Sequence, residues 1–140
     1  MYLNVDEIYT HLYEESIEAI SGNDERLLLA AISGAIVESK GYLHAFDREA
    51  IFSKVGEERD PLLLIWLKDI AVWHYINIAR PAIDFDVRER RYDAAIAWLK
   101  GVQKGDIVPD FPRPVDPVTE TEENTTGIKF SSNTKRGNYI

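Results

Sequence analysis

Histidine is the side chain of this sequence best suited to acid–base or metal chemistry, since the chain contains no cysteine. The three histidines are His11, His44 and His74. None follows a glutamate at the Glu-x-x-His spacing of di-iron bundles. Glu7 lies four residues before His11, on the same face of an expected helix, and such a pair can bind a metal with further ligands. A surface hydrogen bond is the commoner role of this pair.

Other chemical motifs are also missing from the sequence. There is no phosphate-binding GxxxxGK[ST] loop, GxGxxG turn, HExxH pair or GxSxG elbow. No serine, threonine or lysine stands beside an evident histidine–aspartate pair. We therefore expect a protein that is not an enzyme, with no catalytic, cofactor-binding or metal-ligating residue and no cofactor.

Aromatic residues gather in one apolar stretch. Trp66 and Trp73 are seven residues apart and share one side of an expected helix, beside His74 and Tyr75. Such a cluster can line a ligand pocket, but it forms part of a hydrophobic core more often. We interpret it as core.

Charge is unevenly distributed along the chain. The first 25 residues hold seven acidic side chains and no lysine or arginine, and a basic group follows late in the sequence. The two groups can be complementary between neighbouring copies, although two solvated helix faces explain them equally well. The candidate interface residues are Asp6, Glu7, Glu14, Glu15, Arg88, Arg90 and Arg91. The acids around the arginines argue against a DNA-binding helix.

The elements that position these residues are helices. We expect an all-α domain over residues 1–103, with three main helices and one or two short ones around a buried apolar helix at about 61–79. Asp60-Pro61 marks the start of that helix. The other main helices are expected from Asn23 or Asp24 to about Phe46, and from Asp84 or Asp86 to about Gln103. Short helical turns are expected after Asn4, over 14–20, and within 47–59.

Small residues on the helix that precedes Phe46 indicate a close helix–helix approach. They are Ala30, Ala31, Gly34 and Ala35. The expected core of the last helix consists of Val87, Ala95, Trp98, Leu99 and Val102.

A second region, residues 104–140, is expected to be an extended arm. Four prolines between residues 109 and 117 favour stiff, extended geometry. Apolar side chains return near the end, and a purely solvating tail rarely keeps them. The alternating Ile128-Lys129-Phe130 segment can add a strand to a partner. The candidate contact residues are Ile128, Phe130, Tyr139 and Ile140. The alternative interpretation is a flexible C-terminal segment that contacts no partner.

Composition restricts the class of protein. The 140 residues carry a net charge of −8, which disfavours general nucleic-acid binding. The longest apolar run, Leu62 to Leu67, is too short to span a bilayer, and acidic residues occupy the place of a signal-peptide core. We expect a cytoplasmic protein that does not bind membranes.

The order of several segments carries a family resemblance. The segments are IVESKGYL at 36–43, DPLL at 60–63 and VRERRYDAAIAWLKGV at 87–102. Over about residues 2–108 the chain resembles the Mu-like prophage protein family of the head–tail joining region, small helical proteins long described as of unknown function. It is more distantly similar to the all-α head–tail connector proteins of tailed phages. The segment His44–Arg48 departs from the arginine-rich stretch that is common there.

The resemblance implies a structural protein and no catalytic residues. It implies a neck, connector or adaptor that forms a homo-oligomeric ring and docks to phage head, portal or tail proteins, first in the cytoplasm and then in the virion. The main alternative is a small DNA-binding or regulatory helical protein, which predicts salt-dependent DNA binding. A metal-binding bundle or enzyme is a third possibility, and it predicts converging carboxylates and histidine.

Overall fold

A computed structural model describes residues 1–9, 25–79 and 85–115 of the chain. Every regular element in these ranges is helical, which confirms the all-α expectation. The first described elements are α1 (Val5–Tyr9), α3 (Glu25–Tyr42), α4 (Arg48–Phe52) and the short 3-10 helix η2 (Gly56–Glu58). The chain then forms α5 (Pro61–Ala79) and α6 (Phe85–Lys104). None of these helices is long and apolar enough to cross a membrane.

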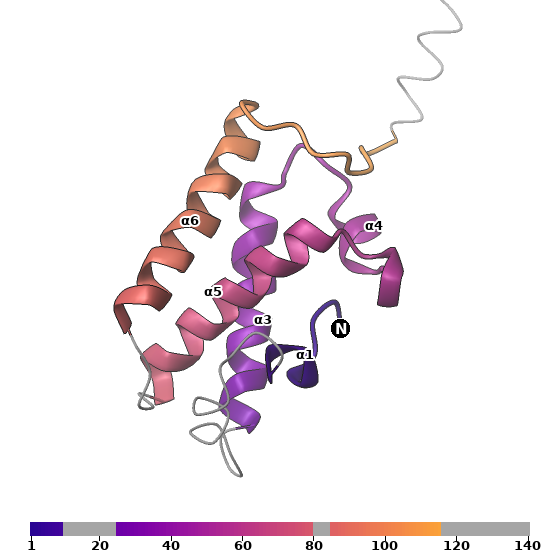
Figure 1. The fold of residues 1–140 in the computed structure, drawn as a ribbon. Helices are drawn as coiled ribbons and strands as arrows, with labels where there is room; N and C mark the ends of the chain where they lie inside the picture. The colour runs from indigo at the N-terminus through magenta and orange to yellow at the C-terminus, as the bar shows by residue number, and fades with distance from the viewer. Residues whose placement is uncertain (10–24, 80–84, 116–140) are drawn as a thin grey trace, which may run out of the picture.

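Helix α5 lies at the centre of the domain, as the sequence predicts. Figure 1 shows α5 crossing α3, with α6 alongside. Its start follows the expected chemistry, because the Asp60 carboxylate accepts a hydrogen bond from the backbone N–H of Leu63 at 2.8 Å. Pro61 takes the first helical position, where a missing N–H has no consequence. The core formed around α5 includes Leu28, Ile32, Leu67, Ile70, Tyr75, Ile76 and Leu99.

Helix α3 ends earlier than expected, at Tyr42 instead of Phe46. The chain turns there because Asp47 caps a new helix, accepting a hydrogen bond from the backbone N–H of Ala50 at 3.1 Å. Leu43 and Phe46 still enter the core from the intervening turn. The last helix begins at Phe85, so Asp86 lies inside it and does not cap it, while Asp84 lies outside the described residues.

The small residues of α3 divide between two faces. Ala31 and Ala35 are buried and allow the close approach that the sequence predicts. Ala30 and Gly34 are exposed. A Cβ added to Gly34 would lie 3.9 Å from the His74 ring, an ordinary contact, so the packing of α3 on α5 does not require glycine there. Among the expected core residues of α6, Val87 and Trp98 are only half-buried.

The N-terminal segment is attached to the turn before α5. Asn4 and Glu7 form a capping box, in which each side chain accepts a hydrogen bond from the other residue's backbone N–H. The Glu7 carboxylate also binds Arg59, with Nη1 at 2.8 Å and Nη2 at 2.5 Å, and Arg59 donates to the backbone carbonyl of Tyr2 at 2.7 Å. The helical turns expected over 14–20 lie outside the described residues.

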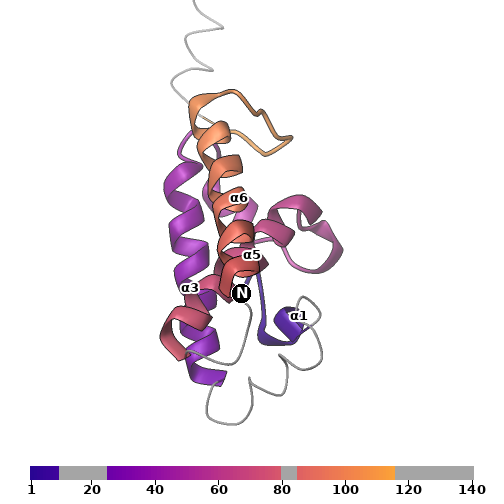
Figure 2. The same cartoon turned by 60° about the vertical axis from the view of Figure 1, so that its left-hand side comes forward.

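The chain after α6 differs from the expected arm at its start. Gly105 ends α6 with φ of +90°, and the following segment crosses the end of the bundle towards α4, as Figures 1 and 2 show. Phe111 is buried against Phe46 and Trp98, and the Pro112 carbonyl accepts a hydrogen bond from the backbone N–H of Asp47 at 2.8 Å. Residues 105–112 thus belong to the domain, although they are irregular as expected.

Candidate functional site

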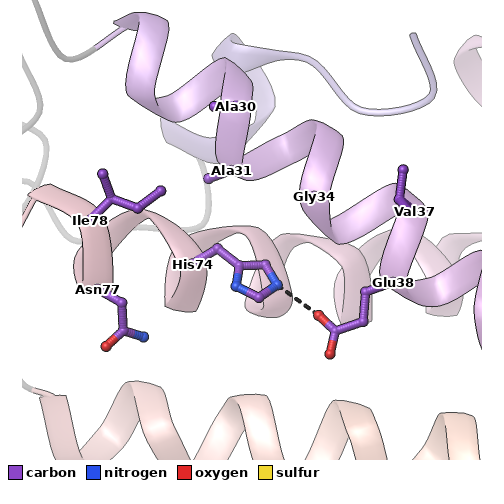
Figure 3. A pocket seen from close by; sticks show the side chains of 8 residues that line it. All are labelled: Ala30, Ala31, Gly34, Val37, Glu38, His74, Asn77 and Ile78. Atoms are coloured by element: carbon purple, nitrogen blue, oxygen red, sulfur yellow. Dashed lines mark hydrogen bonds and ion pairs between the residues drawn. The ribbon is translucent and has the colours of Figure 1, made fainter.

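A groove lies between α3 and the second half of α5. Its volume is about 520 Å³, and its lining is mostly apolar. Figure 3 shows α3 along one side and α5 along the other, with Glu38 and His74 pointing toward one another. The full lining is Ala30, Ala31, Gly34, Val37, Glu38, His74, Asn77 and Ile78.

Three helices share one carboxylate at the edge of this groove. Glu38 Oε1 of α3 lies 2.6 Å from Nε2 of His74 on α5. Its other oxygen accepts a hydrogen bond from the Tyr92 hydroxyl on α6 at 2.8 Å. Burial and this bond to Glu38 raise the pKa of Tyr92 above its usual range, because a nearby negative charge disfavours the phenolate. The network thus fixes the relative positions of α3, α5 and α6.

The network also sets the chemistry that the groove offers. When Nε2 of neutral His74 donates to Glu38, Nδ1 is left as an acceptor. No described lysine or arginine forms an ion pair with Glu38. The groove therefore combines an apolar floor with a carboxylate and an imidazole at one edge. This combination suits a ligand or segment that has an apolar body and a positive charge or hydrogen-bond donor.

The aromatic residues mainly join helices. Trp73 stacks on Tyr92 with ring centroids 5.7 Å apart, and Trp66 lies 6.3 Å from Trp98. Both tryptophans of α5 are half-buried and pack against the core. The structure supports the core interpretation of the tryptophans, while the neighbouring His74 lines the groove.

The sequence-based expectation of one basic face on α6 is wrong for Arg88. This residue is only 4% exposed, because it shares a helix face with the buried Ala95, Leu99 and Val102. Arg90 and Arg91 are exposed, and Nη1 of Arg91 lies 3.7 Å from the buried carboxylate of Asp69. Of the three arginines, only Arg90 and Arg91 remain candidates for contact with another molecule.

The acidic candidate interface residues also differ in whether they are available to another molecule. Asp6 is exposed and remains available. Glu7 is bound by Arg59 within the same chain, which corrects its expected role toward a neighbouring copy. The remaining candidates lie outside the described residues, namely Glu14, Glu15, Ile128, Phe130, Tyr139 and Ile140.

A second surface lies near the start of α5. Leu62 and Ile65 are 44% and 46% exposed, although the sequence predicts burial of this helix. Asp69 follows on the same helix face, at i+7 from Leu62, but its side chain is only 4% exposed. Arg91 of α6 reaches that face through Asp69. We call the exposed residues Leu62, Ile65 and Arg91 the α5 face.

Metal chemistry finds no further support in the described part of the chain. No group of three or more histidine, aspartate and glutamate side chains there is arranged to hold a metal ion. His44 lies in another hollow, beside Lys40 and Pro114, and His11 lies outside the described residues.

Sequence reasoning did not identify Glu38 or Tyr92 as site residues. The available signal was weak: Glu38 and His74 are polar residues within two largely apolar helices, and their pairing depends on how the helices pack.

Comparisons with known proteins supply no further assignment, since no family model, no curated protein and no solved structure matches this chain.

Proposed function

We propose that this protein is a structural head–tail joining protein of a tailed phage or prophage. It acts as a neck, connector or adaptor that self-associates into a ring and docks to head, portal or tail components. It works in the cytoplasm during assembly and then in the virion. The family resemblance over about residues 2–108 suggests this role, and the all-α fold is compatible with it.

The observation that carries the proposal is the α5 face, defined above by Leu62, Ile65 and Arg91. Exposed apolar side chains near an exposed arginine are typical of a protein-binding surface, where the apolar groups supply free energy and the charge sets orientation. A ring requires a heterologous interface, in which one patch meets a different patch of the next copy. Exposed Arg90 and Asp6 provide charges of opposite sign for such patches.

The test is a double substitution, Leu62→Glu with Ile65→Glu, in the full chain. Both side chains are nearly half exposed, so we expect the fold to persist in circular dichroism. Light scattering should show loss of self-association, and co-purification with head, portal and tail proteins encoded by neighbouring genes should fall about tenfold or more. Val55→Glu changes an exposed valine elsewhere and should have no effect.

Two results would reject the proposal. One is a wild-type protein that neither self-associates nor retains any head, portal or tail protein. The other is unchanged association of the double variant. Salt-dependent DNA binding that requires Arg90 and Arg91 would instead favour the regulatory alternative.

A further inference from the structure

The α3–α5 groove has a glycine in its lining, although helix packing does not require one there. Gly34 lies inside α3, where glycine is about 1 kcal/mol less favourable than alanine. An alanine side chain would fit there without a clash. The glycine therefore leaves open space over the groove floor, beside the exposed walls formed by Val37 at 69% and Ile78 at 53%. Open space of this kind between apolar walls suits an inserted side chain.

The charge at the edge of the groove selects the kind of occupant. Glu38 accepts hydrogen bonds from His74 and Tyr92, and no described lysine or arginine pairs with it. In a largely apolar groove, a lysine or arginine next to an apolar residue would add an ion pair to this carboxylate and bring an apolar side chain against the walls.

One segment of the chain has this composition. Residues 127–140 contain three basic and no acidic side chains, whereas the whole chain carries −8 and the preceding 126 residues therefore carry −11. Opposite net charges attract the segment to the domain. Its apolar and basic side chains are interleaved, namely Ile128, Lys129, Phe130, Lys135, Arg136, Tyr139 and Ile140.

The position where the described chain ends brings this segment within reach. Pro114 lies in one hollow with Lys40 and His44, at the end of α3 that is next to Glu38. Lys40 and Gly34 are six helical residues apart, about 9 Å along the axis. Residues 116–127 can extend over roughly 40 Å. A tethered segment has an effective concentration in the millimolar range, so in dilute solution it competes well against a second copy.

We propose that residues 127–140 dock into the α3–α5 groove of the same chain, with an apolar side chain over Gly34 and a lysine or arginine beside Glu38. The segment then covers the groove in the free protein. This inference does not depend on the head–tail role, which rests on the α5 face.

The test uses cysteine pairs in the full chain, which has no cysteine of its own. Val37→Cys with Ser131→Cys joins a groove wall to the segment, and Val55→Cys with Ser131→Cys is the matched control at another exposed valine. Mild oxidation should give an intramolecular disulfide about tenfold faster in the first pair, at a rate independent of protein concentration.

Two further variants locate the contact. Gly34→Ala places a methyl group on the groove floor and favours the helix, so it should slow disulfide formation while the melting temperature stays equal or rises. Changing Lys129, Lys135 and Arg136 to glutamine should also slow formation of the disulfide between positions 37 and 131.

Equal rates of disulfide formation in the two cysteine pairs, or a disulfide that forms only between two chains, would overturn the inference. Light scattering of the same variants reports self-association separately, so failure of either proposal can be recognised.

Discussion

At the scale of single residues, Arg59 connects segments that are far apart in the sequence. Its guanidinium binds the Glu7 carboxylate and the Tyr2 carbonyl, and both charged side chains are largely buried. The hydrogen bonds from Arg59 lower the pKa of Glu7, because they stabilise the ionised form. This pair attaches α1 to the turn before α5, in the way that the Glu38–His74–Tyr92 network attaches three helices.

This pair predicts a specific loss of stability in acid. Because the folded pKa of Glu7 lies below its ordinary value of 4.5, the stabilisation is complete above that value and is lost as pH falls through the folded pKa. Glu7→Gln should lower the free energy of unfolding at pH 7 by about 1–3 kcal/mol. Urea titrations from pH 7 to 3 should show a flatter pH dependence for this variant. Asp6→Asn, at the exposed neighbour, should behave as wild type; an unchanged pH profile in Glu7→Gln would contradict the role of the pair.

At the scale of elements, helix ends follow local side-chain chemistry. Asp60 and Asp47 each accept a backbone hydrogen bond at a helix start. Gly105 ends α6 in a left-handed conformation, and the N–H of Ile107 then reaches the carbonyl of Gly101 at 3.1 Å. Residues with a Cβ are strained at this φ, so glycine is required at the end of α6.

Two glycine substitutions should therefore have opposite effects. Gly105→Ala should lower the free energy of unfolding by about 1–2 kcal/mol, since its φ is +90°. Gly41→Ala, in the last turn of α3 with no atom within 4 Å of the new Cβ, should raise it by up to about 1 kcal/mol. Thermal and urea unfolding of both variants provides the measurement. Equal effects of the two changes would show that φ at Gly105 does not control the helix end.

At the scale of the whole molecule, the segment after α6 closes one end of the helix bundle. Phe111 fills the space between Phe46 and Trp98, and the Arg113 guanidinium lies 4.8 Å from the centre of the Phe46 ring. Ile107 packs against the core as well. The segment therefore contributes to folding and also fixes the point from which the rest of the chain departs.

Removal of this closure should destabilise the domain. Phe111→Ala should lower the free energy of unfolding by about 3 kcal/mol, because a buried aromatic ring is lost and a cavity remains. Val115→Ala, at a residue that is 75% exposed, should change it by less than about 0.5 kcal/mol. Chemical unfolding measures both. If Phe111→Ala matched Val115→Ala, the segment would not be part of the domain core.

The sequence by itself determined the helical class, the central position of α5 and the caps at Asp60-Pro61, because periodicity and capping act over a few neighbouring residues. Only the tertiary structure decided which polar residues meet. The pairing of Glu38 with His74 and Tyr92, the burial of Arg88, the capture of Glu7 by Arg59 and the docking of Phe111 all join distant segments. Such contacts depend on the rotation and crossing of packed helices, and a linear pattern does not specify these for helices as uniformly apolar as α5.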